Sequence, residues 1–313
     1  MSRGLSGESF LVTGAYGCIG AWVCRQLVQE GVPVVAYDLG EDPYRLREVL
    51  TEAELDGVAL VRGDVADLGG LERAAEAHGV THVIHLAALL IPLVRADPPR
   101  GALVNVVGAT NAFELAKRRS LQGLAYASSA AVYGPADGSR IEDARNPSTL
   151  YGVFKLTNEA VAKVYWAEDG VGSIGLRPYV VYGPGRDQGL TAGPTLAMAA
   201  AARGEAFHIA FGGRCQLQLA RDTARVFVAA ARSGHRGASA FNVGGPVSHL
   251  EEVVRAIEAA EPESAGRITF DDVQLPFPES LDSGSLADVV GGVGYTPLAE
   301  GVRETIEHYR AGA

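Results

Sequence analysis

The sequence predicts a doubly wound α/β fold, a parallel sheet with helices on both faces, followed by a smaller mixed α/β C-terminal domain. Two observations predict it. From Ser9 onward, short apolar runs alternate with longer segments of helical period, which is typical of parallel strands buried on both faces. In addition, the first apolar run leads directly through a glycine-rich turn into a helix, as at the start of many such folds.

Six strands are expected from the apolar runs, which lie near residues 9–13, 32–37, 58–61, 81–85, 123–127 and 172–177. Helices should fill the gaps between them, with right-handed crossovers. One predicted helix spans about residues 99–118, where apolar residues recur at near-helical spacing, and another spans 149–167.

The pattern changes after Pro178, where turns rich in glycine and proline separate alanine-rich helices at 196–203 and 222–232. With 313 residues, the chain is long enough for one large or two modest domains. We expect a first domain in residues 1–178, rejoined by parts of 221–247, and a smaller substrate-binding domain mainly in 179–313.

The composition is that of an ordinary globular protein, with 47% hydrophobic and 20% charged residues,. Lys plus Arg number 27 and Asp plus Glu 37, so the net charge is −10. No basic run is present, and proteins that bind nucleic acid neutralise phosphates with clustered Lys and Arg. We therefore expect a small-molecule substrate and no nucleic acid partner.

Three features indicate a cytoplasmic protein that does not span a membrane. The three cysteines contain no CxxC pair, so neither a disulfide framework nor a thiolate metal site is expected. Residues 1–8 lack the pattern of a signal peptide, and the apolar stretch 86–94 is far shorter than the roughly 20 residues that cross a bilayer. His82 and His85 should point to opposite faces of a strand, so no metal site is expected there either.

The turn after the first strand carries Gly14, Gly17 and Gly20. Glycines at this spacing let the backbone turn sharply and approach a pyrophosphate at the N-terminus of the next helix. The turn therefore predicts a dinucleotide site of the Rossmann type, although a tight turn without a ligand has the same spacing.

Acidic residues after the second and third strands strengthen the dinucleotide interpretation. Asp38 ends the second strand, where a carboxylate can accept hydrogen bonds from an adenosine ribose and would repel a 2′-phosphate. This favours NAD over NADP, although Arg45 and Arg47 keep NADP open. Asp64 after the third strand, with the Val65 amide, is placed to bind adenine; the other interpretation is a turn or capping aspartate.

A serine, a tyrosine and a lysine form the candidate catalytic group. Ser129 follows the fifth strand, and Tyr151 and Lys155 lie one helical turn apart,. A cation near a phenol lowers its pKa, so Tyr151 could exchange a proton with a substrate hydroxyl that Ser129 orients. Each residue alone has a structural explanation, such as a snorkelling lysine or a capping serine; their order along the chain favours the catalytic interpretation.

Together these residues resemble the extended short-chain dehydrogenases/reductases of the NAD-dependent epimerase/dehydratase family over most of the chain. The resembling segments are Thr13–Gly20, Asp38, Asp64–Val65, His85–Ala88, Asn105–Asn111, Ser128–Ser129, Tyr151 with Lys155, Arg177–Pro178 and Tyr182–Gly185. The resemblance implies an NAD-binding Rossmann domain and a homodimer that packs through the helices at 99–118 and 149–167.

The cofactor-binding residues expected from the motifs and the resemblance are Gly14, Tyr16, Gly17, Cys18, Ile19, Gly20, Asp38, Asp64, Val65, Leu86, Ala87, Ala88, Asn105, Tyr151, Lys155 and Pro178. The expected catalytic residues are Ser129, Tyr151 and Lys155. The substrate candidates are Leu89, Ser128, Ser129, Tyr133, Val180 and Gln216.

The chain departs from the family at positions that determine the substrate. Dehydratases carry Asp-Glu where this chain has Ala130 and Ala131, and two methyl groups cannot transfer protons, so dehydration is disfavoured. Nucleotide-sugar epimerases have Asn at the position of Val180 and, by our alignment, an arginine at that of Cys215. Arg214 next to it faces the other side of a strand.

These departures leave the net reaction open. We favour an NAD-dependent epimerase that acts on a secondary alcohol of a sugar or sugar derivative through a transient ketone. The alternative is an NAD-dependent dehydrogenase or reductase of a non-nucleotide sugar, sugar acid or small polyol. A catalytically silent dinucleotide sensor is disfavoured because Ser129, Tyr151 and Lys155 are all retained.

Overall fold

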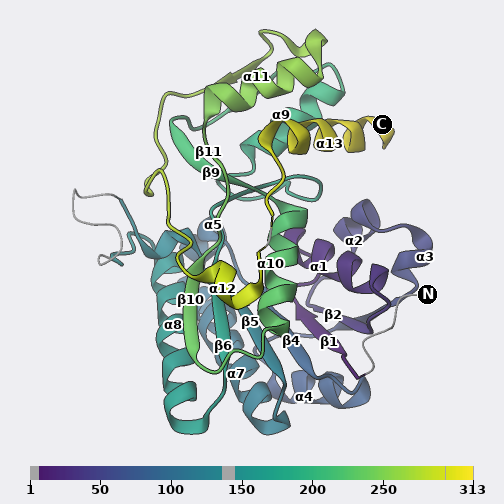
Figure 1. Ribbon diagram of the computed structural model, residues 1–313, viewed down its shortest axis with the longest axis vertical. Coiled ribbons are helices and arrows are strands. Elements are labelled where there is room, and N and C mark those ends of the chain that lie inside the picture. The colour runs from purple at the N-terminus through teal and green to yellow at the C-terminus, as the bar shows by residue number, and fades with distance from the viewer. Residues whose placement is uncertain (1–6, 136–144, 293, 313) are drawn as a thin grey trace.

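The computed structural model, which describes residues 7–135, 145–292 and 294–312, has a large α/β layer structure below a smaller second domain (Figure 1). The main sheet has seven parallel strands in the order β10-β6-β5-β4-β1-β2-β3. They are β1 (Phe10–Thr13), β2 (Val34–Asp38), β3 (Val58–Arg62), β4 (His82–His85), β5 (Gly123–Ala127), β6 (Ser173–Arg177) and β10 (Ala238–Asn242). The predicted fold class is confirmed.

Alternating side chains send the strands' apolar residues into two cores, one on each face of the sheet. Phe10 and Val12 of β1 pack in a core that also contains residues of α1 (Cys18–Gln29), α2 (Tyr44–Val49), α10 (Ala220–Arg232) and α12 (Leu286–Val290). Leu11 points the other way, into a core with α4 (Leu68–Ala77), α7 (Gly108–Arg119) and α8 (Leu150–Asp169). Short helices α3 (Glu52–Leu55), α5 (Ile91–Ala96) and α6 (Pro98–Ala102) lie in the connections.

The second domain has its own core between three helices and two small sheets. Its helices are α9 (Gly193–Ala202), α11 (Leu250–Ala260) and α13 (Leu298–Ala311). One sheet joins β7 (Val180–Tyr182), β9 (Arg214–Leu219) and β11 (Val247–His249), and the other joins β8 (Phe207–Ile209) and β12 (Ile268–Phe270). Between these segments the chain returns to the first domain, where α10 covers the sheet and β10 pairs with β6.

The six expected strands are present with bounds that differ by at most two residues. The helix expected at 99–118 is divided into α6, a turn of π-helix η1 (Leu103–Val107) and α7. The wider turn places Asn105 in the interior, where it is fully buried, so the helical period that the sequence suggested is locally altered.

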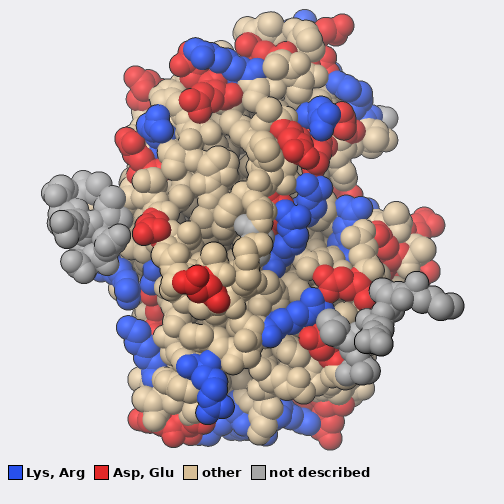
Figure 2. All heavy atoms as spheres, viewed as in Figure 1, with Lys and Arg blue, Asp and Glu red and all other residues tan. Residues whose placement is uncertain are grey.

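In the part of the chain that the structure describes, no helix is both long and apolar enough to cross a membrane. On the face in Figure 2, basic and acidic side chains are interspersed among uncharged ones.

Candidate active site

A cavity of about 550 Å³ lies at the carboxyl ends of the parallel strands, between the two domains. Gly14, Asp38, Leu86, Ser128 and Pro178 line it, each at or just after the end of a strand. This edge of a doubly wound sheet is where such folds bind ligands.

The glycine-rich turn fits a dinucleotide. Gly14 has a φ of +67°, and a Cβ there would lie 2.6 Å from the Ala87 nitrogen; a Cβ on Gly20 would lie 2.5 Å from the Gly14 oxygen. These two glycines are therefore required by the packing of the chain itself. Gly17 lines the cavity at the start of α1 and has no side chain to cap that helix, so the first N–H groups of α1 are left for an anion such as a pyrophosphate.

Asp38 lines the neighbouring part of the cavity and is oriented by the backbone. One carboxylate oxygen accepts the Tyr16 N–H at 3.0 Å and the other accepts the Gly40 N–H at 2.9 Å. A carboxylate oxygen has two lone pairs, so both oxygens keep capacity for ribose hydroxyls. Arg47 pairs with Asp42 at the surface, and Arg45 is bound to Asp187. Neither arginine is directed to a 2′-phosphate, which agrees with NAD.

Asp64 also lines the cavity, but a side chain that the sequence did not indicate engages it. Arg100 donates to Asp64 at 2.9 Å, and the Ala66 N–H donates to its other oxygen at 2.9 Å. Burial alone would raise the pKa of Asp64, but these two donors outweigh it and hold the pKa below its usual value.

Ser129, Tyr151 and Lys155 line the same cavity. Ser129 caps the 3₁₀ turn η2 (Ala130–Val132) by accepting the Ala131 N–H at 3.2 Å. Thr149 caps α8, so Tyr151 lies in its first turn. Lys155 is buried, donates to the Ala127 carbonyl at 2.8 Å, and its Nζ lies 5.6 Å from the centre of the Tyr151 ring.

The electrostatics of Tyr151 differ from those expected. Burial raises the pKa of Tyr151, and the hydrogen bond with Ser129 and the charge of Arg186 lower it by a smaller amount, so the pKa stays above its usual value. Burial also lowers the pKa of Lys155 to about 8. Arg186 is thus the cation that lowers the pKa of Tyr151, a role for which the sequence predicted Lys155.

A buried ion pair lies next to the segment that carries Ser128 and Ser129. Arg177 forms two 2.7 Å bonds to Glu159, which lies one turn after Lys155 on α8. Glu159 also accepts the Ser128 hydroxyl at 2.6 Å. With both charges paired and hydrogen-bonded, this network can hold the end of β5 and the middle of α8 in a fixed relation.

The loop after β7 closes the cavity from the other side. Arg45 binds Asp187 through two nitrogens, at 2.6 and 2.9 Å, and the Tyr44 hydroxyl donates to Asp187 at 2.6 Å. The same loop continues as residues 188–191, which also line the cavity. The loop therefore joins the second domain to α2 beside the glycine-rich turn.

Four predicted site residues are not among the described residues that line the cavity, and packing gives the reason in each case. Tyr133 is buried with its hydroxyl on Asn242 and Arg177. Val180 is in the core of the second domain. Gln216 is buried and bonds both the Leu281 N–H and its carbonyl.

Asn105 is the fourth such residue. Its side chain accepts the Leu89 N–H at 2.7 Å and donates to the Leu89 carbonyl at 3.0 Å. It therefore holds the segment after β4 in place instead of lining the cavity. All other predicted site residues line it: Gly14, Tyr16, Gly17, Cys18, Ile19, Gly20, Asp38, Asp64, Val65, Leu86, Ala87, Ala88, Leu89, Ser128, Ser129, Tyr151, Lys155 and Pro178.

The cavity also has a set of lining residues that sequence reasoning missed as site residues. They are Arg100, Tyr179, Arg186, Leu190, Thr191 and Phe277. Tyr179 and Arg186 flank the Tyr182–Gly185 motif. Their closeness to this motif in the sequence could have predicted that they line the cavity. Phe277 is far from every motif in the sequence, and no pattern indicated it.

Comparison with protein families gives a match over most of the chain. The model of the NAD-dependent epimerase/dehydratase family matches residues 10–244. Among curated proteins, UDP-glucuronate 4-epimerase 2 of Arabidopsis thaliana is 34% identical over 192 residues, which cover 58% of this chain and 44% of that protein. The chain thus matches less than half the length of this relative.

Solved structures give a match over nearly the whole chain. The UDP-glucose 4-epimerase of Thermus thermophilus, solved in complex with NAD, has a TM-score of 0.81 at 25% identity and covers 97% of this chain and 100% of its own. The L-threonine dehydrogenase of Clostridium difficile has the same TM-score at 22% identity, covering 97% and 98%. The fold alone is therefore compatible with more than one net reaction.

Proposed function

Because the chain belongs to the NAD-dependent epimerase/dehydratase family, we propose that it is an NAD-dependent epimerase acting on a secondary alcohol of a sugar or sugar derivative through a transient ketone. The observation that carries this proposal is the presence of Ser129, Tyr151 and Lys155 in the cavity that begins at the uncapped N-terminus of α1.

In this proposal the first domain, residues 1–178 with parts of 221–247, holds NAD, and 179–313 mainly contribute to the substrate side. The glycine-rich turn would hold the pyrophosphate, Asp38 the adenosine ribose, and Asp64 with Val65 the adenine. Ala87, Ala88 and Pro178 would flank the nicotinamide half. When bound, NAD supplies a hydride acceptor and donor at the carbinol carbon of the substrate.

Each residue of the trio has one task. The Tyr151 oxygen accepts the proton of the substrate hydroxyl and later returns it. The Ser129 hydroxyl donates a hydrogen bond to the same substrate oxygen and holds it in place. Lys155 and Arg186 provide positive charge near the Tyr151 phenolate and so favour its formation.

A second candidate is net dehydrogenation of a non-nucleotide sugar, sugar acid or small polyol. Two positions support this candidate. Val180 and Cys215 stand where nucleotide-sugar epimerases carry polar residues, and both lie in the core of the second domain. Arg214 points away, is exposed, and lies 3.8 Å from Glu279.

The test is the NAD content of the purified protein, measured after denaturation, together with a Tyr151→Phe variant. An epimerase must keep its cofactor through both hydride transfers, so we expect close to one NAD per chain and conversion between isomers without net NADH. Tyr151→Phe should reduce turnover by at least about 100-fold with NAD retained. Tyr165→Phe, on the same helix with its hydroxyl on Glu114, is the control. Exchange of NAD at every turnover would instead identify a dehydrogenase.

We also propose that two copies of the chain associate through η1, α7 and α8. Leu103 and Val107 on η1, and Leu150, Val153 and Val164 on α8, are 39–51% exposed. Clustered exposed apolar side chains are typical of an interface. The free cysteines support a reducing compartment, and we propose the cytoplasm.

The association is tested by light scattering on the native protein. We expect the mass of a dimer for the wild type and of a monomer for Val153→Glu, because a charge would be buried in the interface. Leu60→Glu changes a leucine of similar exposure, 46%, on β3 and should leave the dimer intact. A wild-type monomer at micromolar concentration would refute the proposal.

A further inference from the structure

We propose that the substrate binds with an apolar, uncharged group next to its reacting alcohol and carries no nucleoside diphosphate. The inference rests on the proposed function only in placing the reacting alcohol at Tyr151. The binding surface, called here the apolar wall, consists of Leu89, Leu90, Ile91, Leu93, Leu190 and Phe277, all of which line the cavity.

The apolar wall lies close to the catalytic tyrosine. Four of its residues come from the segment after β4 and from α5, which packs against α8, the helix whose first turn carries Tyr151. In Figure 1, α5 lies at the upper end of the sheet, next to the second domain. Asn105 holds the backbone of Leu89 through two hydrogen bonds, so the start of this segment is fixed.

The wall continues across the cavity. The end of the Leu90 side chain lies 3.2 Å from the position that a Cβ would take on Gly189, in the loop after β7, and Leu190 follows in that loop. From the second domain, Phe277 packs edge-on against Tyr179 with ring centres 6.0 Å apart, and both rings line the cavity.

Two leucines of the wall remain open to solvent. Leu93 is 54% and Leu190 is 53% exposed, although most large apolar side chains of the described chain are buried. Apolar side chains held at the mouth of a functional cavity are typical of a site that binds an apolar group, because the ligand removes their surface from water.

Charge in the cavity argues against a nucleoside diphosphate. Among the described residues that line it, Arg45 is paired with Asp187 and Arg100 with Asp64. Lys155 donates to a backbone carbonyl beside the catalytic tyrosine. Arg186 has no carboxylate partner within these residues. Its guanidinium donates to the Thr191 hydroxyl, and its Nε is buried without a partner among the described residues.

Arg186 is also positioned for the cofactor. It follows Gly185, on which a Cβ would lie 3.8 Å from the Cys18 Cα, and the first turn of α1 is where a dinucleotide pyrophosphate would lie. A second diphosphate, carried by the substrate, would then find no unpaired arginine among the described lining residues.

The experiment measures binding by calorimetry to the purified protein with NAD, using two series of ligands. One is methyl, butyl and hexyl glucoside, and the other is a series of 2-alkanols of increasing length; UDP-glucose and UDP-glucuronate are compared with them. We expect each added methylene to tighten binding by up to about fourfold, with a negative heat-capacity change, and the UDP-sugars to bind no tighter than methyl glucoside.

A double variant, Leu90→Gln with Leu190→Gln, assigns the effect to the apolar wall. It should lose the dependence on chain length but retain binding of methyl glucoside. Leu60→Gln, which changes an exposed leucine outside the cavity, should retain the dependence. Thermal unfolding of each variant shows that it is folded.

The outcomes separate this inference from the proposed function. Tight binding and epimerisation of a UDP-sugar, without dependence on alkyl length, would overturn the inference and leave the epimerase proposal standing. Chain-length dependence with net NADH formation, or with 2-alkanols only, would support the apolar wall and refute the sugar epimerase. Absence of chain-length dependence in both series would overturn the inference whatever the reaction.

Discussion

At the scale of single residues, the protonation of Tyr151 is decided by the balance between burial and nearby charge. Burial raises its pKa, whereas Ser129 and Arg186 act in the opposite direction. The Lys155 ammonium donates a hydrogen bond to the Ala127 carbonyl. Arg186 therefore supplies positive charge that lowers the pKa of Tyr151, which is the role that the motif assigns to the lysine.

Replacing Arg186 by Gln should move the pH dependence of turnover. Removal of the cation raises the pKa of Tyr151, so the phenolate forms at higher pH, and we expect the rising limb of kcat/KM for alcohol oxidation to shift upward by roughly one pH unit. Arg203→Gln alters an exposed arginine that pairs with Glu205 and is the control. An unchanged profile for Arg186→Gln would show that its charge does not reach the phenol.

At the scale of elements, the π-helical turn η1 is the feature that positions the segment after β4. It turns Asn105 inward, where the side chain bonds both backbone groups of Leu89. The backbone carbonyl of Asn105 accepts a hydrogen bond from the side-chain amide of Asn158 at 2.9 Å. One local irregularity in a helix thus connects α8, which carries Tyr151, to the start of the apolar wall.

Asn105→Ala should therefore impair substrate binding more than cofactor binding. Two backbone groups of Leu89 lose their partners, so we expect the protein to be destabilised by about 1–3 kcal/mol and KM to rise roughly tenfold with little change in NAD affinity. Asn111→Ala is the comparison. It removes a hydrogen bond to the Val65 carbonyl, and Val65 is proposed to bind the adenine, so this variant should weaken NAD binding instead. Unfolding midpoints, KM and NAD titration distinguish the two, and equal effects at both ends would contradict the assignment.

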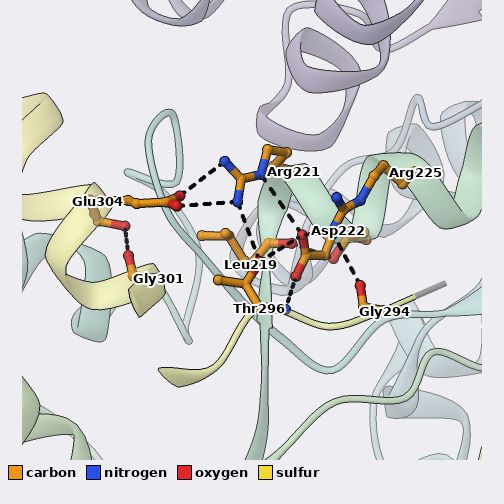
Figure 3. Close-up of polar contacts among 10 residues, drawn as sticks. Leu219, Arg221, Asp222, Arg225, Gly294, Thr296, Gly301 and Glu304 are labelled. Atoms are coloured by element: carbon orange, nitrogen blue, oxygen red, sulfur yellow. Dashed lines mark hydrogen bonds and ion pairs between the residues drawn. The ribbon is translucent and has the colours of Figure 1, made fainter. Parts of the chain in front are cut away.

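At the scale of the whole molecule, a polar cluster around the buried Asp222 of α10 ties the C-terminal segment to the first domain (Figure 3). Asp222 is buried and accepts the Thr296 N–H at 2.6 Å and its hydroxyl at 3.2 Å. Arg225 bonds Asp222 and also the Gly294 carbonyl, and Arg221 pairs with Glu304 of α13 at 3.0 Å. The contacts hold α13, which packs on α9 and α11, in a defined relation to the sheet.

Asp222→Ala should destabilise the protein by about 2–4 kcal/mol, because it removes a buried carboxylate that accepts several hydrogen bonds and leaves the Thr296 N–H without a partner. Arg221→Met removes a partly exposed ion pair and should cost less than about 1 kcal/mol. Urea unfolding measures both. Equal losses would mean that the carboxylate makes no special contribution to the attachment of the C-terminal segment.

Local spacing in the sequence was enough to predict the sheet of the first domain and the residues on the cofactor side of the cavity. The glycines after β1, Asp38 at the end of β2, and the tyrosine and lysine one turn apart are each set within a few residues. The parallel topology then brings the ends of the strands to one edge. For this reason the family and the fold class could be named from the sequence, and most of the site residues named from it line the cavity.

The sequence by itself thus determined the fold class, a preference for NAD and the candidate catalytic trio, since each depends on short-range patterns. Only the tertiary structure decided which side chains of the second domain and of the loops line the cavity. It buried Val180 and Gln216, which had been expected at the substrate, and brought Leu190 and Phe277 to the cavity. That selection depends on packing between segments far apart in the chain, and side chains in such packing have no period that a single sequence reveals.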